Sequence, residues 1–252
     1  MPEHVNILCL KWGKLYPAEY VNKLYAGVAR NLKRPFRFFC CTDNPEGLDP
    51  RIETIPFPQN PGIKRAWPDI LVKLELTRPG FGDLQGPTLF MDLDIVIMEA
   101  LDPFFDFEPG RFCIIHNWVN WRKKLIGQRP PVGNSSVFRF NAGTESDHIY
   151  QTFLKEMHRA EDSSQFNTEQ AFLTYAAKNV VWWPDEWVRS FKWNCRPKFP
   201  LNLFCAPKPP KKCRILVFHG KPNPDEAILG YRGKKIHHHS KAAPWISEHW
   251  KT

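Results

Sequence analysis

The start of the chain orders its apolar residues as a strand, a helix and a second strand, and this order restricts the fold more than any other feature. Val5–Leu10 is a short apolar run that ends in polar and turn residues, as expected for a buried strand. Over Ala18–Leu32 the apolar residues recur at helical spacing, and Phe36–Cys41 is a second apolar run followed by turn residues. Strands joined by a helix favour an α/β fold with parallel strands.

The rest of the sequence continues this pattern over a length that suits one core. Of the 252 residues 42% are hydrophobic and 24% are charged, which is the balance of a folded globular protein. Because periodicity is weak after Gly220, we expect a main domain over residues 1–222 and a C-terminal tail, residues 223–252, that packs on or near it. Further strands are predicted at Thr88–Met91, Phe112–Ile115, Ser136–Phe140, Val180–Trp183 and Ile215–Phe218, and helices at Ile70–Thr77, Ile149–Arg159 and Thr168–Ala177.

Charge and cysteine content indicate what kind of partner the protein binds and in which compartment it works. The net charge of +9 favours an anionic partner, and a nucleotide sugar, an acidic glycan, an anionic membrane surface and a nucleic acid all meet this condition. The 7 cysteines lack C-x-x-C spacing, which indicates reduced thiols rather than a zinc site. With no leader-like start and no apolar run of roughly 18 residues, we expect a cytoplasmic protein. Peripheral contact with a membrane is a further hypothesis, through Lys208, Lys211, Lys212 and Arg214.

Two aspartates interrupt the otherwise apolar stretch Leu89–Ile97. Asp92 and Asp94 are separated by Leu93, and the alternation of a strand would direct both carboxylates to one side. Two adjacent carboxylates are costly unless a cation lies between them, and Mg²⁺ or Mn²⁺ prefers such oxygen ligands. Because open α/β sheets bind ligands at the carboxyl ends of their strands, the pair predicts a cation site for a diphosphate.

The run Leu89–Phe104, which contains this pair and ends Ala-Leu-Asp-Pro-Phe, resembles the Asp-x-Asp region of GT-A glycosyltransferases, especially glycosyltransferase family 8. Val217–Pro222 resembles the late His-x-x-Gly-x-x-Lys-Pro motif of that family, although His219 and Lys221 are closer together than in the motif. The resemblance implies a GT-A, Rossmann-like fold with a mixed, mostly parallel sheet flanked by helices, in which residues 1–222 form the catalytic domain.

The same resemblance implies an activity and the residues that carry it. The activity is a metal-dependent, hexosyltransferase-like transfer of a sugar from a nucleotide diphosphate donor, UDP above all, to a glycan, lipid-linked or other hydroxyl acceptor. The family retains anomeric configuration, but Glu169 in place of an aspartate and the altered late motif leave inversion open, which would need a general base for the acceptor hydroxyl. The implied cofactor is Mn²⁺ or Mg²⁺. The implied metal ligands are Asp92, Asp94 and His219, the implied catalytic residues are Glu169 and Gln170, and the implied donor-binding residues are Trp12, Asp43, Lys73, Leu93, Asn134, Ser136 and Lys221.

Some of these residues also fit the chemistry by their type. Trp12 follows the first strand and suits stacking on a base, whereas Asp43 suits a hydrogen bond from a base or ribose. Glu169 stands where the family has an aspartate, and a carboxylate there would stabilise the positive charge of an oxocarbenium-like transition state. Each residue also has a structural alternative, such as a helix start at Thr168 or a turn before the strand at Asn134.

Two other functions stay open at this point. A nucleotidyltransferase would use the paired aspartates for two-metal phosphoryl transfer, but no Gly-rich phosphate loop follows the first strand. A noncatalytic nucleic-acid or glycan-binding module would account for the positive charge and the many aromatics. The tryptophans of Trp182–Trp187 suit either stacking on an acceptor sugar or core packing, and His237–His239 has no assigned role.

Overall fold

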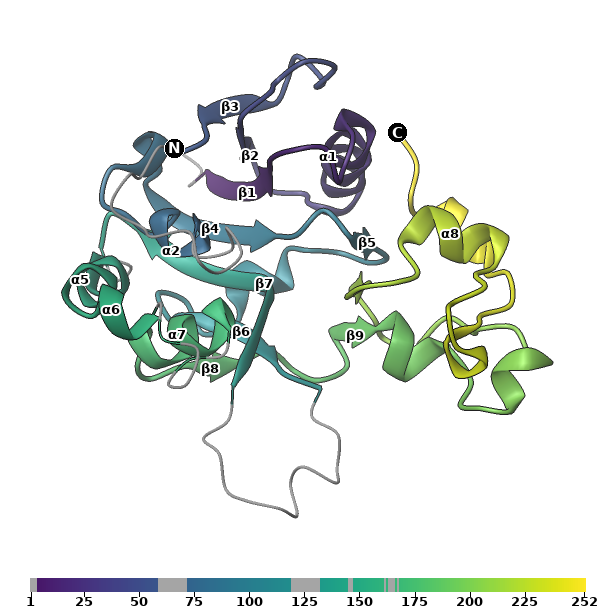
Figure 1. Cartoon of the computed structure of the whole chain (residues 1–252). Coiled ribbons are helices and arrows are strands. Elements are labelled where there is room, and N and C mark those ends of the chain that lie inside the picture. The colour runs from purple at the N-terminus through teal and green to yellow at the C-terminus, as the bar shows by residue number, and fades with distance from the viewer. Residues whose placement is uncertain are drawn as a thin grey trace.

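The computed structural model describes residues 4–58, 72–118, 132–144, 147–160, 162, 166 and 168–252. Its main sheet has seven strands in the order β3-β2-β1-β4-β7-β6-β8 (Figure 1). The strands are β1 Val5–Lys11, β2 Phe36–Thr42, β3 Glu53–Pro56, β4 Gly86–Met91, β6 Cys113–His116, β7 Gly133–Ala142 and β8 Val181–Trp182. Strands β1 to β4 pair in parallel, and β7 runs antiparallel to both β4 and β6.

A smaller sheet of three strands lies beside the main sheet, in the order β5-β10-β9 (Figure 1). Its strands are β5 Ile95–Ile97, β9 Val188–Ser190 and β10 Ile215–Val217. Three residues separate the end of β4 from the start of β5, so the chain passes from one sheet to the other through Asp92-Leu93-Asp94. Strand β10 pairs antiparallel with β5 and parallel with β9, so a late segment of the chain returns to the aspartate pair.

Helices cover both faces of the main sheet (Figure 1). The longest is α1, Ala18–Asn31, which connects β1 to β2. The others are α2 Val72–Glu75, α3 Pro103–Asp106, α5 Asp147–Lys155, α6 Met157–Ala160, α7 Glu169–Ala176 and α8 Pro224–Leu229. Short turns of other helical types are η2 Phe81–Asp83, η3 Phe191–Cys195, η4 Leu201–Leu203, η5 Ile236–His238 and η6 Pro244–Glu248.

Strand β1 is buried along its whole length because both faces of the sheet are covered. Alternation sends Ile7 and Cys9 into a core with α1 and the smaller sheet, whereas Leu8 and Leu10 enter a second core with α2, α5 and α7. Burial on both faces explains why the strand is a continuous apolar run rather than an alternating one.

The tail that was predicted over residues 223–252 packs on α1. Trp250 is buried in the same core as the inner face of α1, and the Nζ of Lys23 lies 3.7 Å from the centroid of its ring. The hydroxyl of Tyr20 donates to Asp225 at 2.7 Å, and Arg30 donates to the carbonyl of His249 at 2.9 Å. The contact is therefore both apolar and polar. None of the helices in the described ranges has the length and apolar character needed to cross a membrane.

The predicted α/β architecture is confirmed, with three differences in detail. Strands β3 and β9 and helix α8 were not predicted, because each is short and its apolar residues show no clear period. The helix predicted over Ile149–Arg159 is divided into α5 and α6 at Glu156. Of the helix predicted over Ile70–Thr77, the first two residues lie outside the described residues, and α2 covers Val72–Glu75.

Candidate functional site

The candidate site forms where several strands of the main sheet end. Parallel pairing places Lys11 of β1 beside Thr42 of β2, and β4 runs parallel to β1 on its other side. Strand β7 is antiparallel, with Val137 opposite Met91, so the start of β7 lies at the edge where β4 ends. This carboxyl edge is where open α/β sheets bind ligands.

Glycine and an irregular pairing shape the start of β7. The register of β6 against β7 shifts between Ile114 and Ile115, and Gly133 lies opposite the end of β6. A Cβ on Gly133 would come within 2.6 Å of Cδ1 of Ile114, so the backbone can approach this closely only with glycine. The close approach sets the position of the polar residues that follow, Asn134 and Ser135.

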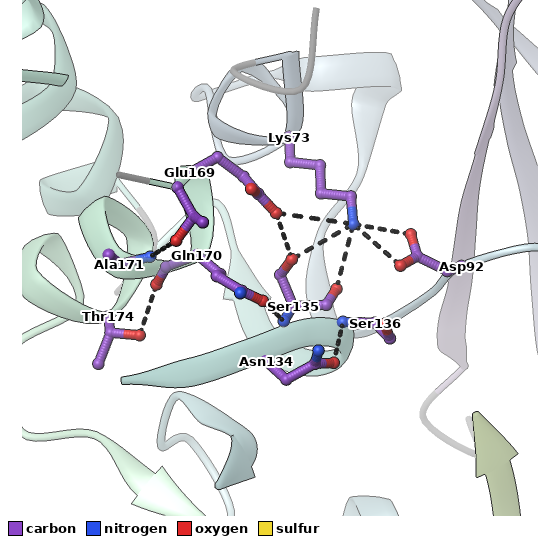
Figure 2. A network of polar contacts seen from close by, with 10 residues as sticks. Lys73, Asp92, Asn134, Ser135, Ser136, Glu169, Gln170, Ala171 and Thr174 are labelled. Atoms are coloured by element: carbon purple, nitrogen blue, oxygen red, sulfur yellow. Dashed lines mark hydrogen bonds and ion pairs between the residues drawn. The ribbon is translucent and has the colours of Figure 1, made fainter. Parts of the chain in front are cut away.

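A buried lysine connects three elements at this edge (Figure 2). The Nζ of Lys73, from α2, lies 2.8 Å and 3.0 Å from the two carboxylate oxygens of Asp92 at the end of β4. It also lies 3.3 Å from Oγ of Ser135 and 4.0 Å from Oε1 of Glu169. Ser135 in turn donates to Oε1 of Glu169 at 2.5 Å. We call these four residues the carboxyl-edge cluster.

The charges of the carboxyl-edge cluster stabilise one another. Burial would lower the pKa of Lys73, but the nearby charges of Asp92 and Glu169 outweigh that effect and raise it. Lys73 and Glu169 are both about 5% exposed. A cation at this depth needs compensating carboxylates, and here it has two.

In the described part of the chain, Asp94 takes part in no salt bridge like that between Asp92 and Lys73. Its Oδ2 accepts a hydrogen bond from the hydroxyl of Tyr16 at 3.3 Å. Burial, and then the charge of Asp92, raise the pKa of Asp94 to about 7, although Lys73 acts in the opposite direction. The two carboxylates are thus close enough to repel each other, and both offer hard oxygen ligands. These residues fit a divalent cation, which would relieve the repulsion.

The backbone at the aspartates differs from the prediction. Asp92 and Asp94 lie in a bend between β4 and β5 rather than within one strand, because their backbones pair with different strands. The amide of Asp92 donates to the carbonyl of Ser136 on β7, whereas the carbonyl of Asp94 accepts from the amide of Phe218 after β10. Leu93, an implied donor-binding residue, has its side chain buried in the core, so only its backbone can face a ligand.

His219 does not join the aspartates in this structure. Its Nε2 lies 2.7 Å from Oγ of Ser190, and its ring stacks on Trp118 at 5.4 Å between centroids. Burial, and then the charge of Lys192, lower the pKa of His219 to about 4, so the ring is neutral at neutral pH. Parallel pairing of β9 with β10 brings Ser190 to this position. Among the described residues no three His, Cys, Asp or Glu side chains form a metal-binding group, and a ligand role for His219 stays a prediction.

The predicted diphosphate ligand Lys221 also has a local partner. Its exposed Nζ lies 2.7 Å from Oε1 of Glu226, which itself caps the start of α8. The side chain is at the surface, where an ion pair of this kind adds little stability and is readily exchanged. Its predicted role is therefore compatible with the structure only if the lysine leaves Glu226.

Trp12 and Asp43 lie at the same edge, after β1 and β2. Asp43 is exposed, and its Oδ2 accepts from the amide of Gly13 at 2.9 Å, which joins the two loops. Trp12 is half-buried and packs on Phe57 with 6.0 Å between ring centroids. Both retain an accessible polar or aromatic surface.

The remaining predicted residues surround Ser135. Gln170 accepts from the amide of Ser135 at 3.3 Å, and Asn134 accepts from the amide of Ser136 at 3.0 Å (Figure 2). Thr168 caps α7 through the amide of Ala171, as its sequence position indicated. Glu169 and Gln170 thus extend from the first turn of α7 toward the edge of the sheet.

Sequence reasoning missed two residues of this site. Ser135 is the hydroxyl that bridges Lys73 and Glu169, and Tyr16 is the hydrogen-bond donor to Asp94. Ser135 stands between the predicted residues Asn134 and Ser136, but nothing in the sequence distinguished it from Ser136. Trp183, considered for acceptor binding, is instead core: it is buried and donates to the carbonyl of Val137 at 3.2 Å.

The fold defined by these elements is the GT-A fold, and solved glycosyltransferase structures share it. The galactosyltransferase LgtC, in complex with donor and acceptor sugar analogues, aligns with a TM-score of 0.58 and 16% identity over 87% of this chain and 88% of its own. The bifunctional glycosyltransferase WbbM aligns with a TM-score of 0.56 and 11% identity over 87% of this chain and 46% of its own. GlyE of Streptococcus pneumoniae TIGR4 aligns with a TM-score of 0.53 and 10% identity, over 86% of this chain and 56% of its own.

These similarities concern the fold. No protein-family model matches the sequence, and comparison with curated proteins gives no match. The predicted GT-A fold is confirmed, and the likeness to glycosyltransferase structures is the one that the Asp-x-Asp region indicated.

Proposed function

We propose that this protein is a glycosyltransferase that moves a sugar from a nucleotide diphosphate donor, UDP above all, to a hydroxyl of a glycan or lipid-linked acceptor. A fold alone hosts many activities, so the proposal rests on the site. The observation that carries it is the pair Asp92 and Asp94 at the carboxyl edge of a GT-A sheet: Lys73 compensates Asp92, whereas Asp94 takes part in none of the salt bridges among the described residues.

Asp92 and Asp94 would hold Mn²⁺ or Mg²⁺. When bound, the cation supplies positive charge to the diphosphate, which departs more readily when its negative charge is neutralised. Lys73 keeps the side chain of Asp92 in place through both carboxylate oxygens. Lys221, once released from Glu226, would add a second positive charge beside the phosphates.

The donor would extend along the edge of the sheet. Trp12 and Asp43, in the loops that follow β1 and β2, suit the base and the ribose. Asn134 and Ser136, at the start of β7, suit the sugar hydroxyls. The donor would then span from these two loops to the carboxyl-edge cluster.

Glu169 and Gln170 are the proposed catalytic residues. Glu169 is buried and already accepts from Ser135, so its carboxylate is held in one place and is available to stabilise positive charge at the anomeric carbon. Because Glu169 accepts from Ser135 and lies 4.0 Å from the Nζ of Lys73, it is poorly suited to take a proton from the acceptor hydroxyl, which supports retention of anomeric configuration over inversion. Glu169→Gln would keep the hydrogen-bond acceptor and remove the charge.

Binding of UDP with and without Mn²⁺ tests the proposal. Thermal unfolding of the wild type should shift upward with UDP only when the cation is present, because a ligand that binds the folded state stabilises it by mass action. Asp94→Asn should lose this shift, whereas the matched control Asp83→Asn, an exposed aspartate that precedes the start of β4 at the opposite edge of the sheet, should keep it. Glu169→Gln should keep the shift but slow release of UDP from the cognate UDP-sugar by roughly a hundredfold or more.

Two results would contradict the proposal. One is binding of UDP that is equally strong without a divalent cation. The other is an unchanged shift in Asp94→Asn whose circular dichroism shows a folded protein.

A further inference from the structure

A long stretch of the second half of the chain has no negative charge. No Asp or Glu stands between Glu186 and Asp225, although lysine and arginine recur throughout the stretch. Its exposed lysines include Lys198, Lys208, Lys211 and Lys212. The stretch covers β9, η3, η4 and β10, so it is a part of the folded protein rather than a tail.

The same stretch exposes large apolar side chains. Phe204 is 76% exposed and Leu201 is 57% exposed, and Trp193 and Phe199 are each about half exposed. Ile236, from η5, is also exposed. A soluble protein rarely gathers such side chains in one place unless they contact a partner. We give the name basic apolar surface to the exposed apolar side chains of this region and the exposed lysines of the same stretch: Trp193, Phe199, Leu201, Phe204 and Ile236, with Lys198, Lys208, Lys211 and Lys212.

Hydrogen bonds hold the two segments of this surface together. Asn202 is 1% exposed, and its Nδ2 donates to the carbonyls of Ile236 and His239 at 3.1 and 2.9 Å. Arg196 donates to the carbonyl of His238 at 3.0 Å. Because Asn202 and Arg196 donate inward to the carbonyls of the η5 segment, the apolar side chains of these turns are left on the outside. The exposure is therefore a property of the fold and not of a loose chain end.

We propose that the basic apolar surface binds the face of a lipid bilayer that contains anionic lipids. Aromatic and aliphatic side chains insert at the boundary between headgroups and acyl chains, and lysines around them attract anionic headgroups. Both elements are present here, and the stretch between Glu186 and Asp225 itself contributes no carboxylate that would repel an anionic surface.

Two other partners fit this surface less well. A second copy of the chain would bring two lysine-rich faces together, which like charges oppose. A nucleic acid would stack its bases on aromatic rings, but Leu201 and Ile236 have no ring to offer. Aliphatic side chains next to lysines match a membrane boundary instead.

Sedimentation with vesicles tests the proposal, and it requires neither nucleotide nor cation, so it is independent of the proposed transferase activity. The wild type should pellet with vesicles of phosphatidylcholine and phosphatidylglycerol in equal parts and stay in solution with phosphatidylcholine alone. Leu201→Ser with Phe204→Ser should weaken binding about tenfold or more, and Lys211→Glu with Lys212→Glu should do the same, because insertion and charge attraction act together.

Matched variants and a second assay make the outcome decisive. Leu229→Ser, an exposed leucine on α8, and Lys155→Glu with Lys251→Glu, the same charge change elsewhere, should bind as the wild type does. Equal pelleting with neutral and anionic vesicles, or wild-type binding by both surface variants, would overturn the proposal. The proposal would also be overturned if Leu201→Ser with Phe204→Ser converted a dimer into a monomer in light scattering. It would equally be overturned if the same variant lost binding to a single-stranded oligonucleotide but kept binding to vesicles.

Discussion

The carboxyl-edge cluster and the basic apolar surface use lysine in opposite ways. In the cluster, Lys73 is buried and lies within 4.0 Å of two carboxylates. On the surface, Lys198, Lys208, Lys211 and Lys212 take part in none of the salt bridges found among the described residues. A buried charge must be compensated within the fold, whereas an exposed one can remain available to a partner.

Phenylalanine shows the same contrast. Phe138 is fully buried and stacks on Phe90 at 4.8 Å and Phe112 at 5.8 Å between ring centroids. Phe204, in contrast, is 76% exposed. The first stabilises the sheet that carries the site, and the second contributes nothing of that kind. The comparison therefore predicts which substitutions will unfold the protein and which will only change its partners.

The sharpest test of the contrast is Phe138→Ala. Removing this buried ring leaves a cavity beside the rings of Phe90 and Phe112, and it should lower the free energy of unfolding by about 3–5 kcal/mol. Phe204→Ala, the matched control, should change it by less than about 0.5 kcal/mol. Chemical denaturation of both variants measures the difference, and similar losses in the two would mean that the exposed ring is packed in solution.

Lys73→Met tests the charge side of the comparison. The variant leaves Glu169 buried without a cation and removes the partner of Asp92, which is itself partly exposed, so we expect a loss of about 3 kcal/mol. The control is Arg37→Met, which breaks an exposed pair with Glu53 and should cost less than about 1 kcal/mol. Equal losses in urea unfolding would show that burial of the lysine does not matter.

The smallest expected effect comes from Ser135→Ala. Its hydroxyl donates to Glu169 and lies beside Lys73, so its removal should cost about 1–2 kcal/mol. Ser136→Ala is the control, because that hydroxyl lies outside the Lys73–Glu169 network, and it should cost less than half as much. If the two alanine variants unfold at the same denaturant concentration, Ser135 does not hold the cluster together.

Much of the fold was predictable, because its main elements have strong periodicity. The parallel strands β1, β2 and β4 each contain three or four consecutive apolar residues, and α1 has a clear helical period. The position of Asp92 and Asp94 at the end of β4 was also predictable, since charges that interrupt an apolar run mark the end of a buried strand. Strand β9 and helix α8 were not, because three to six residues carry too little pattern to be recognised.

The details of the site depended on contacts between distant residues. Ser135 reaches Glu169 and Lys73 only because β7 begins beside the end of β4 and α7 packs on it. Likewise His219 meets Ser190 and Trp118, rather than the aspartates, because of how β9 and β10 pair. No spacing along the chain contains this information.

The sequence by itself therefore determined the α/β class, the order of the main elements and the pair of carboxylates at the end of a strand, because these follow from local period and local charge. Only the tertiary structure decided which side chain compensates which charge, and which apolar residues stay in water. Both depend on pairing between segments far apart in the chain, where burial changes the energy of a charge or a ring far more than its neighbours in sequence do.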